Sequence, residues 1–184
     1  MIFHETRIRG AYVIEIEKRG DDRGFFARGF CRKEMEGHGL NPDVSQANIA
    51  FSHSRGTLRG LHYQVFPHEE TKLVRCTAGA IFDVIVDLRS ASPSYRQWLG
   101  VELTAEKHSM LYVPEGCAHG YLTLADNTEI FYLVSQFYSP GAEWGVRWND
   151  PTFGIDWPAM ERLVISDKDR NWKDWSETSH DHVA

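Results

Sequence analysis

Residues 57–76, TLRGLHYQVFPHEETKLVRC, carry side chains suited to moving protons and holding anions. The alternation of apolar and polar residues predicts strands over residues 57–64 and 73–77, joined by a loop. Residues two apart in a strand share a face, so we expect His62 and Gln64 on one side and Arg59 on the other. Histidine can exchange a proton near neutral pH, and neighbouring cations such as Lys72 and Arg59 can hold negative charge on a substrate oxygen. The stretch therefore predicts a pocket for acid–base chemistry.

A second informative stretch, PEGCAHG at residues 114–120, has the spacing P-x-G-x-x-H. It is similar to the second motif of the cupin β-barrels, whose histidine points into the barrel and often binds a metal. The first cupin motif usually supplies H-x-H and then a glutamate, whereas here His62 is followed by Tyr-Gln. An amide in place of the second histidine leaves too few good ligands, so we predict a metal-free site. The alternative is a metal held by His62, His119 and either Glu69 or Glu70.

Two more side chains could take part in the chemistry. In the alternating run EIFYLV, Tyr132 could donate a proton from the side opposite the histidine. The alternative, which the residues alone favour, is a core tyrosine with a satisfied hydroxyl. In IFDVIVDL, Asp83 interrupts an almost wholly apolar run, so we expect a central strand with Asp83 in protected surroundings.

The composition indicates a globular protein that binds a small anion. The chain has 184 residues, 42% hydrophobic and 25% charged, which fits a single domain over residues 1–177 with a polar, disordered tail at 178–184. A formal net charge of −6 argues against nucleic acid as a partner. Six basic residues nevertheless fall in the first half of the chain near the predicted pocket, which suits a small anion such as a phosphate ester. A solvated surface is the better interpretation for Arg55 and Arg75, but not for the whole set, which also includes Arg23, Arg28, Arg59 and Lys72.

The cysteines and the apolar runs bear on the location of the protein. Three cysteines, widely spaced and without a CxxC pair, argue against a disulfide scaffold and a thiolate zinc site, and fit a reducing cytoplasm. The N-terminus lacks the long apolar region of a signal peptide. No apolar run approaches the roughly 18 residues that a membrane span needs. We therefore expect a cytoplasmic protein without a membrane partner.

Many short strands at regular spacing, with almost no helical periodicity, predict an all-β antiparallel sandwich or barrel. One short helix is expected over residues 32–38, and HSRG at residues 53–56 could connect a hairpin. The expected strands are 12–16, 25–31, 46–52, 57–64, 73–77, 81–88, 97–103, 110–113, 121–124 and 129–135.

Ten motifs, taken together, carry a specific resemblance. The runs GDDRGFFARGF, QAN, TLRGLHYQ, KLVRC, GAIFDVIVDLR, SPSYRQW, LYVPEGCAHGYLTL, FYSP, WNDP and GIDWP resemble the dTDP-4-dehydrorhamnose 3,5-epimerase family, in order, over roughly residues 1–169. The resemblance implies a cupin-like jelly roll with a few short helices, mainly toward the C-terminus, acting without a cofactor, usually as a homodimer. It implies a nucleotide-linked 4-keto-6-deoxy sugar as substrate. The keto group acidifies the protons at C3 and C5, a base removes one, and an acid on the opposite face returns a proton to the enolate.

The same resemblance implies roles for individual residues. His62 corresponds to the base, Tyr132 to the acid and Asp169 to the carboxylate that orients the histidine. Asp83 is expected as a second buried partner of His62, and Lys72 as the cation near the enolate oxygen. The remaining positions match ligand contacts: His119 in the pocket, Arg23, Arg59 and Lys168 for sugar and diphosphate, Gln46, Asn48 and Glu143 for further contacts, and Tyr138 for stacking on the base. The resemblance also suggests that Arg23 acts across a dimer.

One position departs from the family pattern and widens the choice of substrate. Known members carry a glutamate after GFF-x, whereas this chain has Arg28, which replaces a hydrogen-bond acceptor with a donor. The alternatives are a C3-only epimerase, or an epimerase of a CDP-, GDP- or UDP-linked 4-keto sugar. Outside this class they are a metal-dependent cupin enzyme and a non-catalytic sugar-binding cupin. Against the last stands the joint presence of His62, Lys72, Tyr132 and Asp169.

Overall fold

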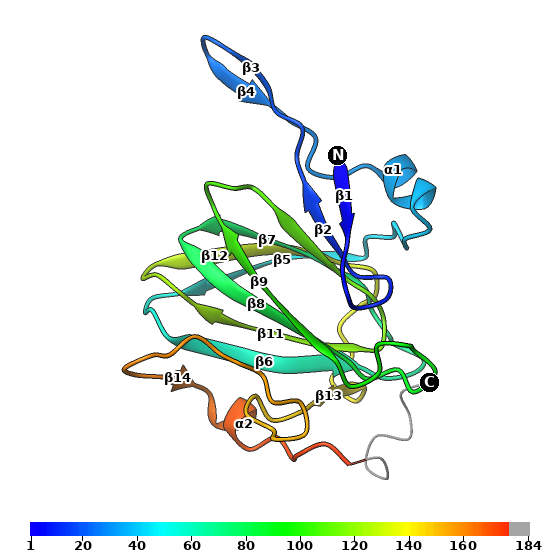
Figure 1. Ribbon diagram of the computed structural model, residues 1–184, viewed down its shortest axis with the longest axis vertical. Coiled ribbons are helices and arrows are strands. Elements are labelled where there is room, and N and C mark those ends of the chain that lie inside the picture. The colour runs from blue at the N-terminus through cyan, green and yellow to red at the C-terminus, as the bar shows by residue number, and fades with distance from the viewer. Residues whose placement is uncertain (177–184) are drawn as a thin grey trace.

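Two antiparallel sheets pack face to face in the computed structural model, which describes residues 1–176 (Figure 1). The first sheet runs in the order β1 (Ile2–Glu5), β2 (Tyr12–Glu15), β10 (Met110–Val113), β7 (Lys72–Ala78), β12 (Thr128–Val134) and β5 (Gln46–Ser52). The second runs β13 (Glu143–Gly145), β6 (Thr57–Gln64), β11 (Cys117–Thr123), β8 (Ala80–Asp87) and β9 (Trp98–Thr104), with β14 (Val164–Ile165) parallel to β6. The predicted all-β sandwich is confirmed.

Three smaller elements complete the fold. A hairpin of β3 (Arg19–Asp21) and β4 (Gly24–Phe26) projects away from the sandwich (Figure 1). Helix α1 (Arg32–Gly37) follows it, and α2 (Asp167–Arg170) lies near β6. Within the described residues, none of the helices is long and apolar enough to cross a membrane. The tail expected at 178–184 lies outside the described residues.

The core between the sheets explains the alternating strands. Val74 and Ile130 of the first sheet pack in one cluster with Ile85 of the second, and each is at most 2% exposed. A second cluster, with Val86 and Trp175, lies where the C-terminal segment covers the other face of the second sheet. Strand β8 is therefore buried on both faces, which is why its sequence is almost continuously apolar.

Several predicted elements agree closely with the structure. Strands at 46–52, 57–64 and 110–113 have the expected bounds, and the helix at 32–38 corresponds to α1. Strand β8 lies between β11 and β9, as its composition predicts. These elements are specified by local patterns of apolar residues and turn formers, so the sequence alone locates them.

Three local predictions are wrong. Residues 53–56 do not connect a hairpin, because β5 pairs with β12 in the first sheet and β6 with β11 in the second. The strand expected at 25–31 ends at Phe26, in a hairpin without sheet neighbours. Strand β11 begins at Cys117 rather than 121, since pairing with β8 extends it through the glycine-containing turn. In each case tertiary pairing decides.

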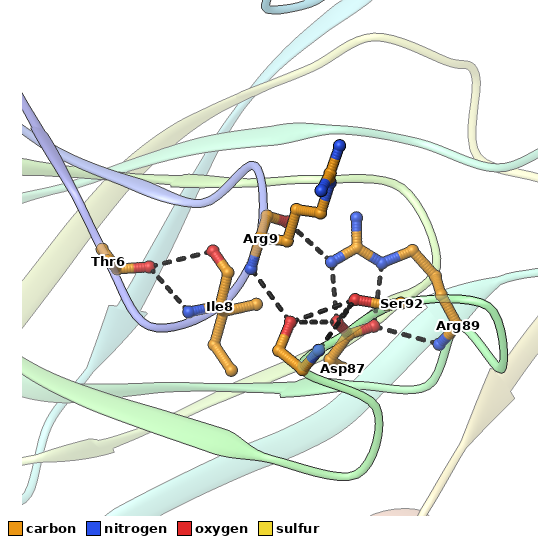
Figure 2. Close-up of polar contacts among 7 residues, drawn as sticks. Thr6, Ile8, Arg9, Asp87, Arg89 and Ser92 are labelled. Atoms are coloured by element: carbon orange, nitrogen blue, oxygen red, sulfur yellow. Dashed lines mark hydrogen bonds and ion pairs between the residues drawn. The ribbon is translucent and has the colours of Figure 1, made fainter.

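A buried carboxylate fastens one end of the sandwich (Figure 2). Asp87, fully buried at the end of β8, accepts hydrogen bonds from Arg89 Nε at 2.8 Å and from the hydroxyls of Ser92 at 2.5 Å and Ser94 at 2.6 Å. Burial tends to raise the pKa of Asp87, but these bonds outweigh it and hold the pKa below its usual value. Arg89 also donates to the carbonyl of Arg9 at 2.7 Å, so the network links the β8–β9 connection to the β1–β2 loop.

Candidate active site

Two adjoining hollows, of about 360 and 230 Å³, share His62, Lys72 and Tyr132 as lining residues. His62 comes from β6 in the second sheet, whereas Lys72 on β7 and Tyr132 on β12 come from the first. The histidine therefore faces a cation and a phenol across the space between the sheets. Tyr132 is half-buried and lines both hollows, so it does not lie wholly within the core.

His62 is held by a carboxylate from the far end of the chain. Its Nε2 lies 2.6 Å from Oδ1 of Asp169, and the backbone N–H of Gly60 donates to Oδ2 at 3.3 Å. The Ser166 hydroxyl caps α2 by accepting from the Asp169 N–H. Burial tends to raise the pKa of Asp169, but the hydrogen bond and charge of His62 outweigh it and lower that pKa. With Nε2 bonded to Asp169, Nδ1 is the ring atom left to accept a proton.

A bulge in β6 brings Arg59 to the same hollow as His62. His62 pairs with His119 and Arg59 with Tyr121, so three steps along β6 face two along β11. Gly60 makes this possible: its φ is +125°, and a Cβ there would lie 2.5 Å from Cα of Gly120. The simple alternation that separates Arg59 from His62 is therefore wrong, and both line the smaller hollow.

The cation in the cavity has a carboxylate beside it. Lys72 Nζ lies 3.1 Å from Oε1 of Glu70, and the two side chains are only 11% and 12% exposed. Both line the larger hollow. The ion pair fixes the ammonium group inside the cavity. Glu70 lies two residues before Lys72, outside β7, so strand alternation gives no signal for its position.

Asp83 does not contact His62 as expected. Its Oδ1 lies 2.7 Å from Nε2 of His119, and both side chains are buried. The reason is sheet order: β11 separates β8 from β6, so Asp83 reaches the histidine of the neighbouring strand. The second sheet thus holds two separate His–Asp pairs, and His119 lines the smaller hollow beside His62.

Polar and aromatic groups surround the mouth of the larger hollow. Tyr138 Oη donates to Oε2 of Glu143 at 2.6 Å, and Lys168 Nζ lies 2.6 Å from Oε1. Burial tends to raise the pKa of Glu143, but these two partners outweigh it and lower the pKa. The N–H of Tyr138 donates to Oε1 of Gln46 at 2.8 Å, and Asn48 completes the lining on β5. Tyr138 is 56% exposed, which leaves its ring open to a planar ligand.

Two expected ligand contacts lie apart from this cavity. Arg23, at the turn of the β3–β4 hairpin, is 90% exposed and paired with Asp21 at 2.6 Å. Arg28 is paired with Glu34 at 3.1 Å and lines a small separate hollow. Within one copy of the chain, the structure does not bring Arg23 or Arg28 to His62.

The side chains that the metal alternative requires do not converge. Glu70 is paired with Lys72, and Glu69 lines another cavity. Across residues 1–176, no group of three or more His, Cys, Asp or Glu side chains could hold a metal ion.

Sequence reasoning did not assign three residues that contact His62 or line the same hollows. Glu70 appears there only as a candidate ligand, and Tyr121 lies two residues after His119 on β11, where alternation would have indicated it. Burial raises the pKa of Tyr121 to about 12. Trp172 contacts the His62 ring edge-on, with centroids 6.3 Å apart, and no local pattern signals this.

The chain is similar to known proteins over nearly its whole length. A model of the dTDP-4-dehydrorhamnose 3,5-epimerase family matches residues 5–177. A dTDP-4-dehydrorhamnose 3,5-epimerase from Sinorhizobium fredii is 43% identical over 169 residues, or 92% of this chain and 87% of the relative. A solved dTDP-4-dehydrorhamnose 3,5-epimerase from Bacillus anthracis, with TDP and PPi bound, is 42% identical with a TM-score of 0.90, covering 95% of this chain and 99% of that one.

A third likeness has a different specificity in its description. A 3'-monoepimerase from Streptomyces bikiniensis, solved in complex with dTDP-quinovose, is 35% identical with a TM-score of 0.85, covering 93% of this chain and 86% of that one. The match of the family model over nearly the whole chain, and the identity to the two 3,5-epimerases, decide the classification. The chain belongs to the dTDP-4-dehydrorhamnose 3,5-epimerase family.

Proposed function

We propose that this protein is an isomerase that inverts C3 and C5 of a dTDP-linked 4-keto-6-deoxy sugar, converting dTDP-4-dehydro-6-deoxyglucose to dTDP-4-dehydrorhamnose in deoxysugar synthesis. One observation carries the proposal: His62 and Tyr132 line the same cavity from opposite sheets. Inversion requires that a proton leave one face of a carbon and another arrive on the opposite face. A base and an acid on facing sheets meet that requirement.

The proposed reaction proceeds through an enolate. His62 Nδ1 takes the proton from C3 or C5, and the electron pair of the C–H bond moves into the sugar 4-keto group. Asp169 stabilises the imidazolium, while the Lys72 ammonium stabilises the enolate oxygen, an effect typically worth about 3–4 kcal/mol per donor. The enolate then collapses, and its carbon takes a proton from the Tyr132 hydroxyl on the other face. Exchange with water restores both groups.

We assign the binding of the sugar and diphosphate to the remaining lining residues. Arg59 contributes positive charge and hydrogen-bond donors beside His62, His119 contributes a polar ring, and the exposed ring of Tyr138 is suited to stacking on the nucleotide base. Gln46, Asn48, Glu143 and Lys168 supply polar contacts at the mouth. The Bacillus anthracis relative, with TDP and PPi bound, supports a thymidine nucleotide as the anchored part of the ligand.

We also propose a homodimer in which Arg23 reaches the partner's cavity. In support, the projecting hairpin exposes Phe26 at 71%, and the outer face of β5 exposes Ile49 at 67% and Phe51 at 43%. Apolar surface of this kind is typical of an interface. Arg28, two residues after the hairpin, would then lie near that interface, where it could alter the choice of nucleotide or sugar.

A complementation experiment tests the dimer. Arg23→Ala and His62→Asn variants are each expected to be inactive, but mixed dimers regain activity because one cavity combines an intact His62 with an intact Arg23. Sedimentation equilibrium measures the dimer itself. No recovery in mixed dimers would show that Arg23 does not act across an interface.

The function is tested by ¹H NMR in D₂O with dTDP-, CDP-, GDP- and UDP-linked 4-keto sugars. We expect deuterium at C3 and C5 of the dTDP sugar, with activity retained after treatment with a chelator. Absence of exchange with all four would overturn the proposal. Activity restored only by iron, manganese or zinc would instead identify a metal-dependent enzyme.

A C3-only epimerase is the second candidate, favoured by the likeness to the Streptomyces bikiniensis 3'-monoepimerase. Deuterium confined to C3 in the same experiment identifies it. For the location we propose the cytoplasm, since all three cysteines are free.

A further inference from the structure

Trp172 contacts the proposed base without lining either hollow. It lies two residues beyond α2, and its ring meets the His62 ring edge-on, with centroids 6.3 Å apart and an interplanar angle of 65°. Asp169 holds one atom of the imidazole, Nε2. That bond and the Cβ–Cγ bond restrain the ring, and a ring contact from a second side restrains the direction of Nδ1 further.

The indole occupies a closely fitted position on the second sheet. Gly145 pairs with His62 across β13 and β6. A Cβ at Gly145 would lie 2.4 Å from Cε2 and 2.6 Å from Nε1 of Trp172. Because no side chain intervenes, the indole rests directly on the backbone opposite the base.

The same ring also contacts a proposed ligand residue. Lys168 Nζ lies 5.8 Å from the centroid of the Trp172 ring, within the range of a cation–π contact. That ammonium also lies 2.6 Å from Oε1 of Glu143 at the mouth. Trp172 is thus shared between the base and the polar groups that would hold the ligand.

The segment that follows Trp172 is fastened to the second sheet. Trp175 is 9% exposed and packs against Phe153 in the cluster on the outer face of the second sheet. Arg147, just after β13, forms an ion pair with Asp174 at 2.6 Å, and its N–H donates to the carbonyl of Lys173 at 3.3 Å. The indole is therefore presented on an anchored backbone.

We infer that Trp172 is a positioning residue for the epimerisation: its ring fixes the angle of the His62 imidazole and steadies Lys168. The inference rests on the proposed function. Small misplacements of a reacting group are costly, so loss of the ring lowers the rate of proton removal more than it weakens binding.

The test compares three variants of the full-length protein in the deuterium-exchange assay with the dTDP 4-keto sugar. Trp172→Leu is expected to lower kcat about tenfold with KM changed less than about threefold, and Trp172→Phe to restore kcat to within about twofold. Trp98→Leu is the matched control, since it also removes a cation–π contact, with Arg7 at 5.1 Å, on strand β9. It should leave kcat unchanged.

A spectroscopic measurement separates positioning from loss of folding. In protein labelled with ¹⁵N-histidine, the His62 signals, assigned with His62→Asn, should keep one tautomer in the wild type and Trp172→Phe but average in Trp172→Leu. Wild-type kcat in Trp172→Leu, or an equal loss in Trp98→Leu, would overturn the inference. Lack of exchange by the wild type itself would instead count against the proposed function.

Discussion

The imidazole of His62 and the carboxylate of Asp169 meet at 2.6 Å although 107 residues separate them in the chain. His62 is on β6, which lies between β13 and β11 in the second sheet, and Asp169 is on a four-residue helix that the C-terminal segment places against β6. The pairing makes the proposed base dependent on the last part of the described chain. The predictions below begin with this pair.

Replacing His62 with Asn should abolish deuterium incorporation at C3 and C5, by about 10²–10⁴-fold, because the proposed proton acceptor is gone. ¹H NMR of the 4-keto nucleotide sugar in D₂O measures the loss. Binding of dTDP, followed by calorimetry, controls for folding and should persist. Exchange at the wild-type rate would remove His62 from the role of base.

Tyr132→Phe should separate the two halves of the reaction. Proton removal depends on His62 on the facing sheet, so exchange at C3 survives better than completed inversion. The measurement compares deuterium incorporation with product formation in one sample. If both steps keep the same fraction of wild-type activity, Tyr132 is not the acid.

Asp169→Asn should lower stability in a pH-dependent way. The pKa of Asp169 is lowered in the folded protein, so the ionised carboxylate stabilises the fold at every pH above its unfolded value of about 3.9, and this is lost as the pH falls through the lower, folded value. The variant should be less stable by about 1–3 kcal/mol at pH 7. Urea unfolding at several pH values measures the difference, which should vanish in strong acid. A constant difference would contradict the linkage.

Gly60→Ala should disrupt the bulge that brings Arg59 and His62 together. The left-handed φ costs about 1–3 kcal/mol for alanine, and the clash with Gly120 adds to this. Gly24→Ala is the matched control, since its φ is +129° but its Cβ would meet nothing within 4 Å. The midpoint temperature of thermal unfolding and kcat should both fall for Gly60→Ala. Equal losses in the two variants would mean that the close approach to Gly120 has no role.

Asp87→Asn should destabilise the fold by about 3–5 kcal/mol, because it leaves Arg89 in a buried network without its charged partner (Figure 2). The exposed pair of Arg147 and Asp174 provides the comparison, and Asp174→Asn should cost about 0–1 kcal/mol. Chemical denaturation measures both. Similar losses would show that burial of Asp87 does not set the cost.

The sequence by itself determined the class of fold and the identity of the principal side chains. Alternating apolar residues specify strands such as β5, β6 and β10. A nearly continuous apolar run specifies a central strand such as β8, because both patterns depend on local geometry. His62, Lys72 and Tyr132 could be singled out by residue type and motif, and the structure places all three around one cavity.

The tertiary structure decided which of these side chains meet. It assigned Asp83 to His119, carried Arg59 to the face of His62 through the bulge at Gly60, and placed Trp172 beside the base. It also placed Arg23 on a projecting hairpin, away from the cavity of its own chain. The physical reason is that sheet order, register shifts and the path of the C-terminal segment depend on contacts between residues far apart in sequence, which periodicity within a single strand does not encode.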